Sequence, residues 1–203
     1  MGSKYAASFT TGGLFHRESL LLVEQFLRLE NWQRVCAKVS DENLLQLRAG
    51  SSSKRVYREI ESRLKTLTLA EMSFLLSGSH HDQAYLLWVA VCRHYQLVGD
   101  FAIEVLRERF TAHNTTLGYD DFDAFFNRKA EWHPELDQLA ESTRKKLRQV
   151  LFRMLREANL LSGKGEISAA LLGPELMNLM IGQARRDFAY LPMPEHYLSM
   201  RAE

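Results

Sequence analysis

The chain has 203 residues, of which 46% are hydrophobic and 25% charged, with a formal net charge of +1. This balance is typical of a globular protein and excludes a disordered chain. The first residues lack the basic start and apolar stretch of a secretory signal. The longest unbroken apolar run, 84–92, is about half of the ~20 residues that a membrane-spanning helix requires. We therefore expect this run to be a buried core helix in a cytoplasmic protein that does not enter a membrane.

The local pattern favours helices throughout the chain, because prolines, glycines and β-branched residues are sparse. The fold class predicted from the sequence is therefore all-α, a compact helical globule. The expected helices are 17–29, 31–38, 42–48, 53–66, 69–77, 82–95, 99–113, 120–130, 135–140, a long helix after the turn 141–143, and 175–190, followed by an extended tail 191–203.

The longest predicted helix has the clearest apolar periodicity. Leu147, Val150, Leu151, Met154, Leu155 and Ala158 follow the spacing of one helical face. Residues 162–165 then have turn chemistry, and the next residues could pair as a small β-hairpin. We expect one compact body made of an N-terminal region, 1–115, and a C-terminal region, 116–203.

Charge is distributed unevenly along the chain. Residues 100–141 contain ten acidic and four basic side chains, whereas residues 142–157 contain six basic and one acidic. Residues 51–65 contain five basic and two acidic side chains. A protein with charges distributed in this way can present a basic face that attracts phosphate and an acidic face that repels phosphate.

Each basic stretch belongs to its own predicted helix-turn-helix unit, the first at about 42–67 and the second at about 135–170. The sequence leaves open a wing on the second unit, formed by the small β-hairpin. In such a unit the second helix enters the major groove of duplex DNA, with its N-terminal amides and outward cations facing phosphate. The predicted DNA-binding residues are Ser52, Ser53, Lys54, Arg55, Arg58 and Arg63 in the first unit, and Ser142, Thr143, Arg144, Lys145, Lys146, Arg148, Arg153 and Lys164 in the second.

A simpler interpretation of the same residues is that every surface helix needs a solvated face, and Lys and Arg commonly occupy it. Glu59 and Glu61 dilute the basic character of the first unit. The second unit is therefore the stronger candidate for DNA contact.

Other residue clusters give no support for metal binding or catalysis. His80 and His81 are adjacent and lack the i, i+4 spacing that brings two ligands to one ion, so we expect them to begin a helix. Asp120, Asp121 and Asp123 are explained by the preference for acidic residues in the first turn of a helix. No phosphate-binding loop or hydrolase motif is present in the sequence. We expect no metal, no cofactor and no enzymatic activity.

Three segments resemble the BrxA family, a core component of BREX (bacteriophage exclusion) systems. They are 142–161 (STRKKLRQVLFRMLREANLL), the opening 5–10 with Glu18 and Ser19, and the middle stretch 87–101. The resemblance extends over nearly the whole chain. It implies an all-helical protein that works beside a DNA methyltransferase, an ATPase, a phosphatase-like protein and a Lon-like protease.

The resulting hypothesis is a monomeric, non-catalytic accessory protein that holds double-stranded DNA mainly through phosphates, with the methyltransferase or the ATPase as further candidate partners. Two alternatives stay open. One is a scaffold whose basic patch meets an acidic protein partner, and the other is an RNA-binding helical module.

Overall fold

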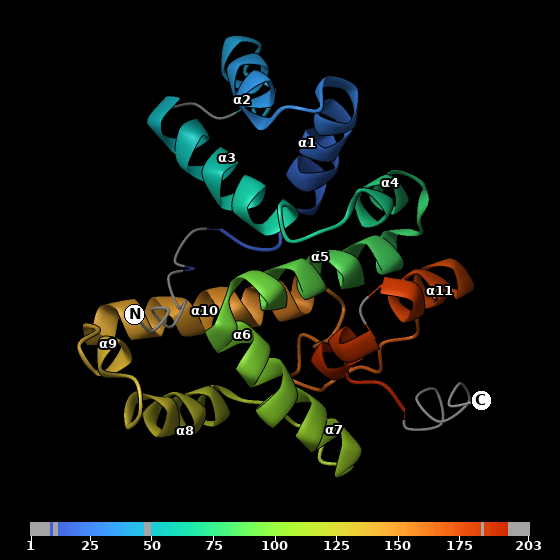
Figure 1. Cartoon of the computed structure of the whole chain (residues 1–203). Coiled ribbons are helices and arrows are strands. Elements are labelled where there is room, and N and C mark those ends of the chain that lie inside the picture. Colours follow the sequence, from blue (N-terminus) through green and yellow to red (C-terminus); the bar gives the residue numbers. More distant parts are fainter. Residues whose placement is uncertain (1–8, 10–11, 47–49, 184, 195–203) are drawn as a thin grey trace.

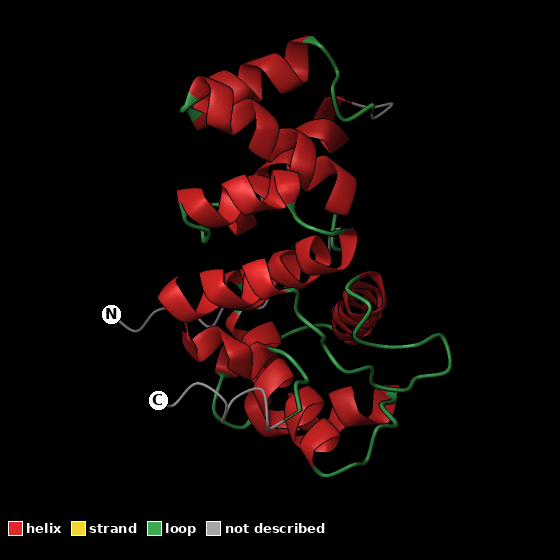
Figure 2. Cartoon of the chain, turned by 90° about the vertical axis from the view of Figure 1, so that its right-hand side faces the viewer, coloured by secondary structure: helices red, strands yellow, loops and turns green. Residues whose placement is uncertain are grey.

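The computed structural model describes residues 9, 12–46, 50–183 and 185–194, with the side chains of 50–52, 183 and 185 left aside. Within these ranges the secondary structure is helical, and no strand is present (Figure 2). The predicted all-α fold class is confirmed.

The helices follow one another closely along the chain. Their bounds are α1 His16–Leu29, α2 Trp32–Asp41, α3 Gly50–Leu64, α4 Leu69–Ser77, α5 His80–His94, α6 Gln96–Phe101, the π-helix η1 Ala102–Arg107, α7 Glu108–Thr111, α8 Tyr119–Ala130, α9 Pro134–Asp137, α10 Glu141–Glu157, α11 Pro174–Gln183 and the 3-10 helix η2 Arg185–Tyr190.

Helix α5 forms the centre of the molecule. Every residue from Asp82 to Cys92 is buried, which confirms that the apolar run 84–92 is a core helix. In Figure 1 α1, α2 and α3 lie above α5, and α6 to α10 lie level with it or below it. Trp88 is completely buried, and its indole N–H donates to the carbonyl oxygen of Tyr190 at 2.9 Å. The central helix thus joins the N-terminal helices to the C-terminal segment.

The predicted helix 42–48 is not formed. Helix α2 begins at Trp32, where the Asn31 side chain accepts from two backbone amides of the first turn, and it continues to Asp41. Asn43 then adopts a left-handed backbone conformation, and the amide of Leu44 bonds to the carbonyl of Val39 at 3.1 Å. This is a Schellman motif, which ends a helix. The described part of the connection to α3, residues 42–46, is therefore a turn, and residues 47–49 of the predicted helix lie outside the described ranges.

Two other predicted helices are subdivided in the structure. The predicted helix 99–113 is a continuous helical segment from Gln96 to Thr111 whose middle, Ala102–Arg107, is π-helical. The predicted helix 175–190 is α11 followed by the 3-10 helix η2, while residues 195–203 of the predicted tail lie outside the described residues.

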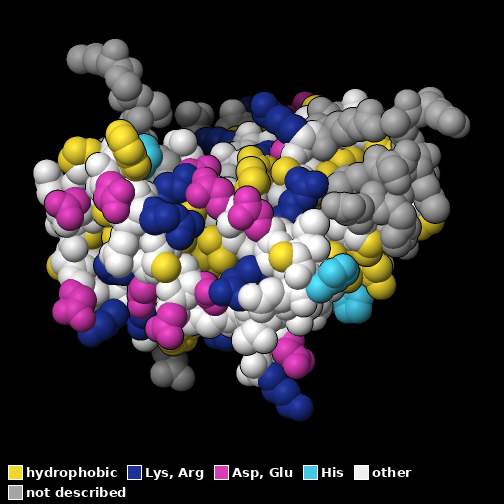
Figure 3. Space-filling view, turned by 90° about the horizontal axis from the view of Figure 1, so that it is seen from below, with side chains coloured by type: hydrophobic (Ala, Val, Ile, Leu, Met, Phe, Trp, Pro, Cys, Tyr) yellow, Lys and Arg dark blue, Asp and Glu magenta, His cyan; other side chains and the backbone are white. Residues whose placement is uncertain are grey.

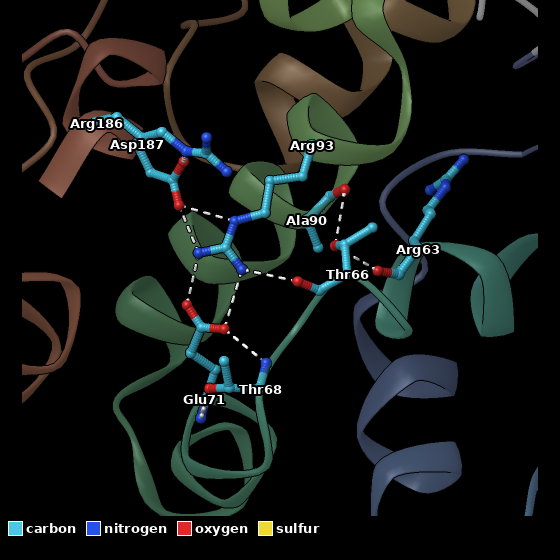
Figure 4. A network of polar contacts seen from close by, with 8 residues as sticks. All are labelled: Arg63, Thr66, Thr68, Glu71, Ala90, Arg93, Arg186 and Asp187. Carbon is cyan, nitrogen blue, oxygen red and sulfur yellow. Dashed lines mark hydrogen bonds and ion pairs between the residues drawn. The ribbon is translucent and has the colours of Figure 1, made fainter. Parts of the chain in front are cut away.

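A buried ion network fastens η2 and α4 to α5 (Figure 4). The guanidinium of Arg93 on α5 contacts both oxygens of Glu71 on α4, at 2.6 and 2.9 Å, and also contacts Asp187 on η2. Glu71 and Asp187 are completely buried. Burial opposes ionisation of Glu71, but the bonds from Arg93 and the Thr68 amide outweigh it and lower the pKa of this carboxyl. The three elements are therefore connected by one charged cluster.

Candidate nucleic-acid interface

Helix α10 is amphipathic, and its apolar side is buried as its sequence predicts. Leu147, Val150, Leu151, Met154 and Leu155 are each at most 3% exposed. The helix ends at a second Schellman motif, in which Asn159 has a positive φ and the Leu160 amide bonds to the Leu155 carbonyl at 2.9 Å. The position of α10 is thus set by the core.

The opposite side of α10 carries an exposed row of cations. Apart from the adjacent Lys145 and Lys146, the exposed positions recur every three or four residues, so their side chains lie on one side of the helix. We call this row the α10 stripe, and it consists of Ser142, Lys145, Lys146, Gln149, Arg153 and Arg156.

Two cations of the α10 stripe form local ion pairs at the surface. Lys145 contacts Glu141 at 2.6 Å, and Arg153 contacts Glu157 at 2.7 Å, with both cationic side chains more than half exposed. Exposed pairs of this kind are weak, at roughly 0.3–0.5 kcal/mol. Within the described ranges Lys146 and Arg156 have no ion-pair partner. The α10 stripe therefore has cations that an external anion could reach.

The N-terminus of α10 begins earlier than the sequence predicts. The prediction of a turn at 141–143 is wrong, because the helix starts at Glu141 and the turn lies between α9 and Ala140. Ser142 and Thr143 occupy the first helical turn, and the capping residue Ala140 offers no side-chain acceptor. The first amides of α10 are thus not capped by a side chain, and such amides favour an anion.

Arg144 and Arg148 do not face outward as expected. Both contact the carboxylate of Asp123 on α8, and Arg144 also donates to the side-chain oxygen of Asn127 at 2.7 Å. Their guanidinium groups lie over the rings of Phe126 and Tyr119, at 4.8 and 4.5 Å from the centroids. These two arginines hold α8 against α10, and their charges are already partnered within the fold.

The segment after α10 is a tight turn with little strand pairing. Two isolated β-bridges are present, Leu161 with Ile167 and Thr116 with Glu166. The segment therefore forms a turn, and the β-hairpin wing that the sequence left possible is not developed. The Ser162 hydroxyl accepts the amides of Lys164 and Glu166 at 3.2 and 3.1 Å. Lys164 is exposed on this turn.

The first predicted unit retains only part of its cationic surface. Lys54, Arg55 and Arg58 are exposed on α3. Arg55 has an interaction partner, whereas Lys54 and Arg58 have none among the described residues. The side chain of Ser52 lies outside the described residues.

The prediction that Arg63 and Ser53 contact DNA is wrong, because both side chains are buried. Arg63 is 4% exposed, contacts Glu59 at 2.8 Å and donates to the Gly13 carbonyl at 2.7 Å. The bond to Gly13, together with the ring of Phe15 at 5.5 Å from the guanidinium, connects α3 to the segment before α1. Neither residue is available to a phosphate.

The face seen from below is not cationic. In Figure 3 acidic and basic side chains alternate across it. Among the described ion pairs, Lys129 on α8 contacts both Asp100 and Glu104, at 2.8 and 2.6 Å, and Arg109 contacts Asp121. This mixed face offers no uniform field to a polyanion.

The described residues offer no metal centre, no membrane-spanning helix and no disulfide. No group of three metal-ligating side chains occurs within them. None of their helices has the length and apolar character needed to cross a bilayer. Cys36 and Cys92 are both free thiols, and burial raises the pKa of Cys92.

Sequence reasoning missed Gln149 and Arg156 as members of the α10 stripe. Their spacing from Lys145 and from each other was a usable signal, since 145, 149, 153 and 156 follow one helical face. No comparable signal in the sequence indicated that Arg144 and Arg148 both pair with Asp123, because Asp123 lies 21 and 25 residues away from them.

Comparisons with known proteins point to one family. The BrxA family model matches residues 3–183. The relatives include a protein named "BREX protein BrxA" from Escherichia coli O9:H4 (strain HS), 26% identical over 87% of this chain and 84% of the relative. Another of that name, from Bacillus cereus (strain H3081.97), is 28% identical over 78% of this chain and 79% of the relative.

A solved structure has the same fold. The crystal structure of an uncharacterized protein from Magnetospirillum magneticum superposes with a TM-score of 0.77, covers 94% of this chain and 99% of its own, and is 21% identical. Because the family model matches most of the sequence, the chain belongs to the BrxA family.

Proposed function

We propose that this protein binds double-stranded DNA through the phosphate backbone, as a non-catalytic component of a BREX phage-defence system. The membership in BREX rests on the names of its relatives. The DNA-binding role rests on the surface of α10.

The observation that carries the proposal is the α10 stripe. Four cations, Lys145, Lys146, Arg153 and Arg156, follow one exposed face of a single helix, and no long-range carboxylate of the described residues pairs with them. The nearby amides at the α10 N-terminus add a partial positive charge. A ridge of this kind is suited to phosphates.

The shape of α10 favours duplex DNA over duplex RNA. A helix of 17 residues is about 25 Å long and fits the wide major groove of B-form DNA. The major groove of A-form RNA is too deep and narrow for side chains to read. Apart from Gln149, the long side chains of the stripe are cationic, which supports phosphate contact with little base selection.

Lys54 and Arg58 on α3 supply a second, weaker candidate contact. Figure 1 shows α3 and α10 diverging from the middle of the molecule toward the same side. We infer that α10 makes the primary contact and that α3 adds at most a flanking phosphate contact.

A salt titration tests the proposal. The affinity for a fluorescent 25-base-pair duplex is measured by anisotropy over a range of salt concentrations, and the logarithm of the association constant should fall linearly with the logarithm of salt. Unlabelled duplex DNA should compete better than single strands or duplex RNA. A flat salt dependence would contradict phosphate binding, and preferential competition by RNA would favour the RNA-binding alternative.

Two controls separate the proposed function from its rivals. Incubation of the duplex with the protein and magnesium or manganese should leave the DNA intact, whereas cleavage would indicate a nuclease. Absence of DNA binding at low salt would favour the scaffold alternative, in which the α10 stripe meets an acidic protein.

A further inference from the structure

The connection between α8 and α9 exposes the indole of Trp132. This side chain is 81% exposed, whereas Trp88 is completely buried and Trp32 is partly buried and stacked on Phe26. Tryptophan usually buries most of its large ring in a folded protein. None of the described residues makes a ring stack, a cation–π contact or a hydrogen bond with this indole. Packing within the fold therefore does not account for a tryptophan at this position.

The pairing of α8 with α10 places this connection near the start of α10. Asp123 of α8 contacts Arg148 of α10. Asn127, one turn further along α8, contacts Arg144, one turn nearer the start of α10. The two helices are therefore antiparallel, and Figure 1 shows α9 next to the beginning of α10. Trp132 thus lies at the end of the molecule where α10 begins.

The surroundings of the indole are acidic. Residues 130–141 contain four acidic side chains and no lysine or arginine. Glu131 directly precedes Trp132, and Asp137 lies in the short helix α9. Both carboxylates are exposed, and neither forms an ion pair with another described residue. We call residues 131–137 the α8–α9 corner. At the left of Figure 3, where α8 and α9 lie, acidic side chains are next to apolar ones.

The cations nearest to the α8–α9 corner in the sequence do not neutralise it. Lys129 contacts two carboxylates of the helical segment before α7, at 2.8 and 2.6 Å. Lys145 contacts Glu141 at 2.6 Å. Arg128 is exposed on the last turn of α8 and pairs with no described residue of the corner. The α8–α9 corner therefore keeps an excess of negative charge beside an exposed aromatic ring.

This combination selects a cationic partner. The face of an indole attracts an ammonium or guanidinium group, and carboxylates beside the ring add to that attraction. DNA phosphates would instead be repelled by Glu131 and Asp137. A neutral apolar partner would have to remove water from these two carboxylates without offering them a hydrogen bond or a charge in return. The charges thus distinguish among partners that an apolar ring alone would accept equally.

The α8–α9 corner is also positioned before any partner binds. The amide of Trp132 donates to the carbonyl of Lys129 at 3.2 Å, and Leu136 of α9 is buried at 1% exposure. Arg144 and Arg148 hold α8 against α10. A preorganised surface loses little conformational entropy on association, which favours binding.

We propose that the α8–α9 corner docks an arginine-containing segment of another protein. A guanidinium lies over the indole of Trp132, with Glu131 and Asp137 beside it. Arginine is preferred to lysine, because its planar group stacks on an aromatic face and can pair with a carboxylate at the same time. The inference does not rest on DNA binding, since the docking segment is a protein and its test needs no DNA.

The test is the binding of a fluorescein-labelled hexa-arginine peptide to the full chain, measured by anisotropy. Trp132→Ala should weaken the affinity about two- to fivefold, and Trp132→Phe should retain part of it, because a phenyl ring keeps an aromatic face. Glu131→Gln combined with Asp137→Asn should also weaken the affinity. The matched control, Asp41→Asn with Glu42→Gln, removes the same charge from the exposed end of α2 and should leave the affinity nearly unchanged. A hexa-lysine peptide should bind less tightly than hexa-arginine.

Tryptophan fluorescence shows whether the peptide binds at Trp132. The difference in emission between the parent chain and Trp132→Phe reports this residue, and its quenching by acrylamide should decrease when hexa-arginine binds. Far-ultraviolet circular dichroism of Trp132→Ala should match that of the parent chain, since the replaced side chain is exposed. A parent chain that does not bind the peptide would overturn the proposal, and so would equal affinities of the parent and Trp132→Ala. Protection of Trp132 by duplex DNA, with none by the peptide, would also overturn it.

Discussion

Arg148 on α10 contacts the carboxylate of Asp123 on α8, and the same carboxylate also pairs with Arg144. The pair is partly exposed, with side-chain exposures of 19% and 31%. We expect Asp123→Ala to lower the free energy of unfolding by about 1–2 kcal/mol, because two cations lose their partner. Urea denaturation measures this loss.

A matched control for this prediction is Glu24→Ala on α1. Its pair with Arg28 is 2.5 Å long but well exposed, with side-chain exposures of 65% for Arg28 and 45% for Glu24. The control should change the free energy of unfolding by less than about 0.5 kcal/mol. Equal losses in both variants would mean that Asp123 does not fasten α8 to α10.

The α10 stripe predicts a change in the salt dependence of DNA binding. Replacing Lys146 and Arg156 by glutamine should remove two phosphate contacts, so the slope of log affinity against log salt should become shallower by about 1.8. Arg144→Gln removes one charge from the same helix, but that charge is bound to Asp123. It should leave the slope nearly unchanged, and an equal effect of Arg144→Gln would locate the DNA elsewhere.

The sequence predicted local features well and distant pairings poorly. Helix α10 was recognised because Leu147 to Leu155 follow a period that depends on neighbours three and four residues away. The helix predicted at 42–48 was an error because Asn43 adopts a left-handed conformation, which composition alone does not reveal. Local pattern thus located the elements, with errors at their ends.

The candidate site was predicted only in part for a related reason. Charge counts identified α10 as basic, but they could not tell a cation bound within the fold, such as Arg148, from a free one, such as Lys146. That distinction depends on where α8 packs. Arg63 was likewise expected at the surface, although its bond to Gly13 spans 50 residues and buries it.

The buried network around Arg93 predicts a large loss of stability. Arg93→Met should lower the free energy of unfolding by about 3–5 kcal/mol, because it leaves Glu71 and Asp187 buried without their cation. Glu71→Gln keeps the shape of the side chain and should cost less, which retains a measurable folded state. Thermal and urea unfolding measure both variants.

The control for the network is Lys65→Met, which removes the partner of Glu61 from a pair whose lysine side chain is 53% exposed. It should cost at most about 1 kcal/mol. If Arg93→Met were no more harmful than Lys65→Met, the cluster of Arg93, Glu71 and Asp187 would not be what holds η2 and α4 to the central helix.

Acid should destabilise the protein in two steps that differ in origin. Burial and the neighbouring charge of His80, whose ring stacks on that of His16 at 4.3 Å, lower the pKa of His16 from its ordinary value of 6.5. The unfolded chain therefore takes up this proton first, and stability decreases as the pH falls below about 6.5. Glu71 has a lowered pKa, so its contribution is present above the ordinary value of 4.5 and is lost as the pH falls below it. Burial also lowers the pKa of His94, so we expect His16→Gln to reduce the first step and to leave the second, measured as the free energy of unfolding from pH 8 to 3. An unchanged first step in this variant would assign it to another group.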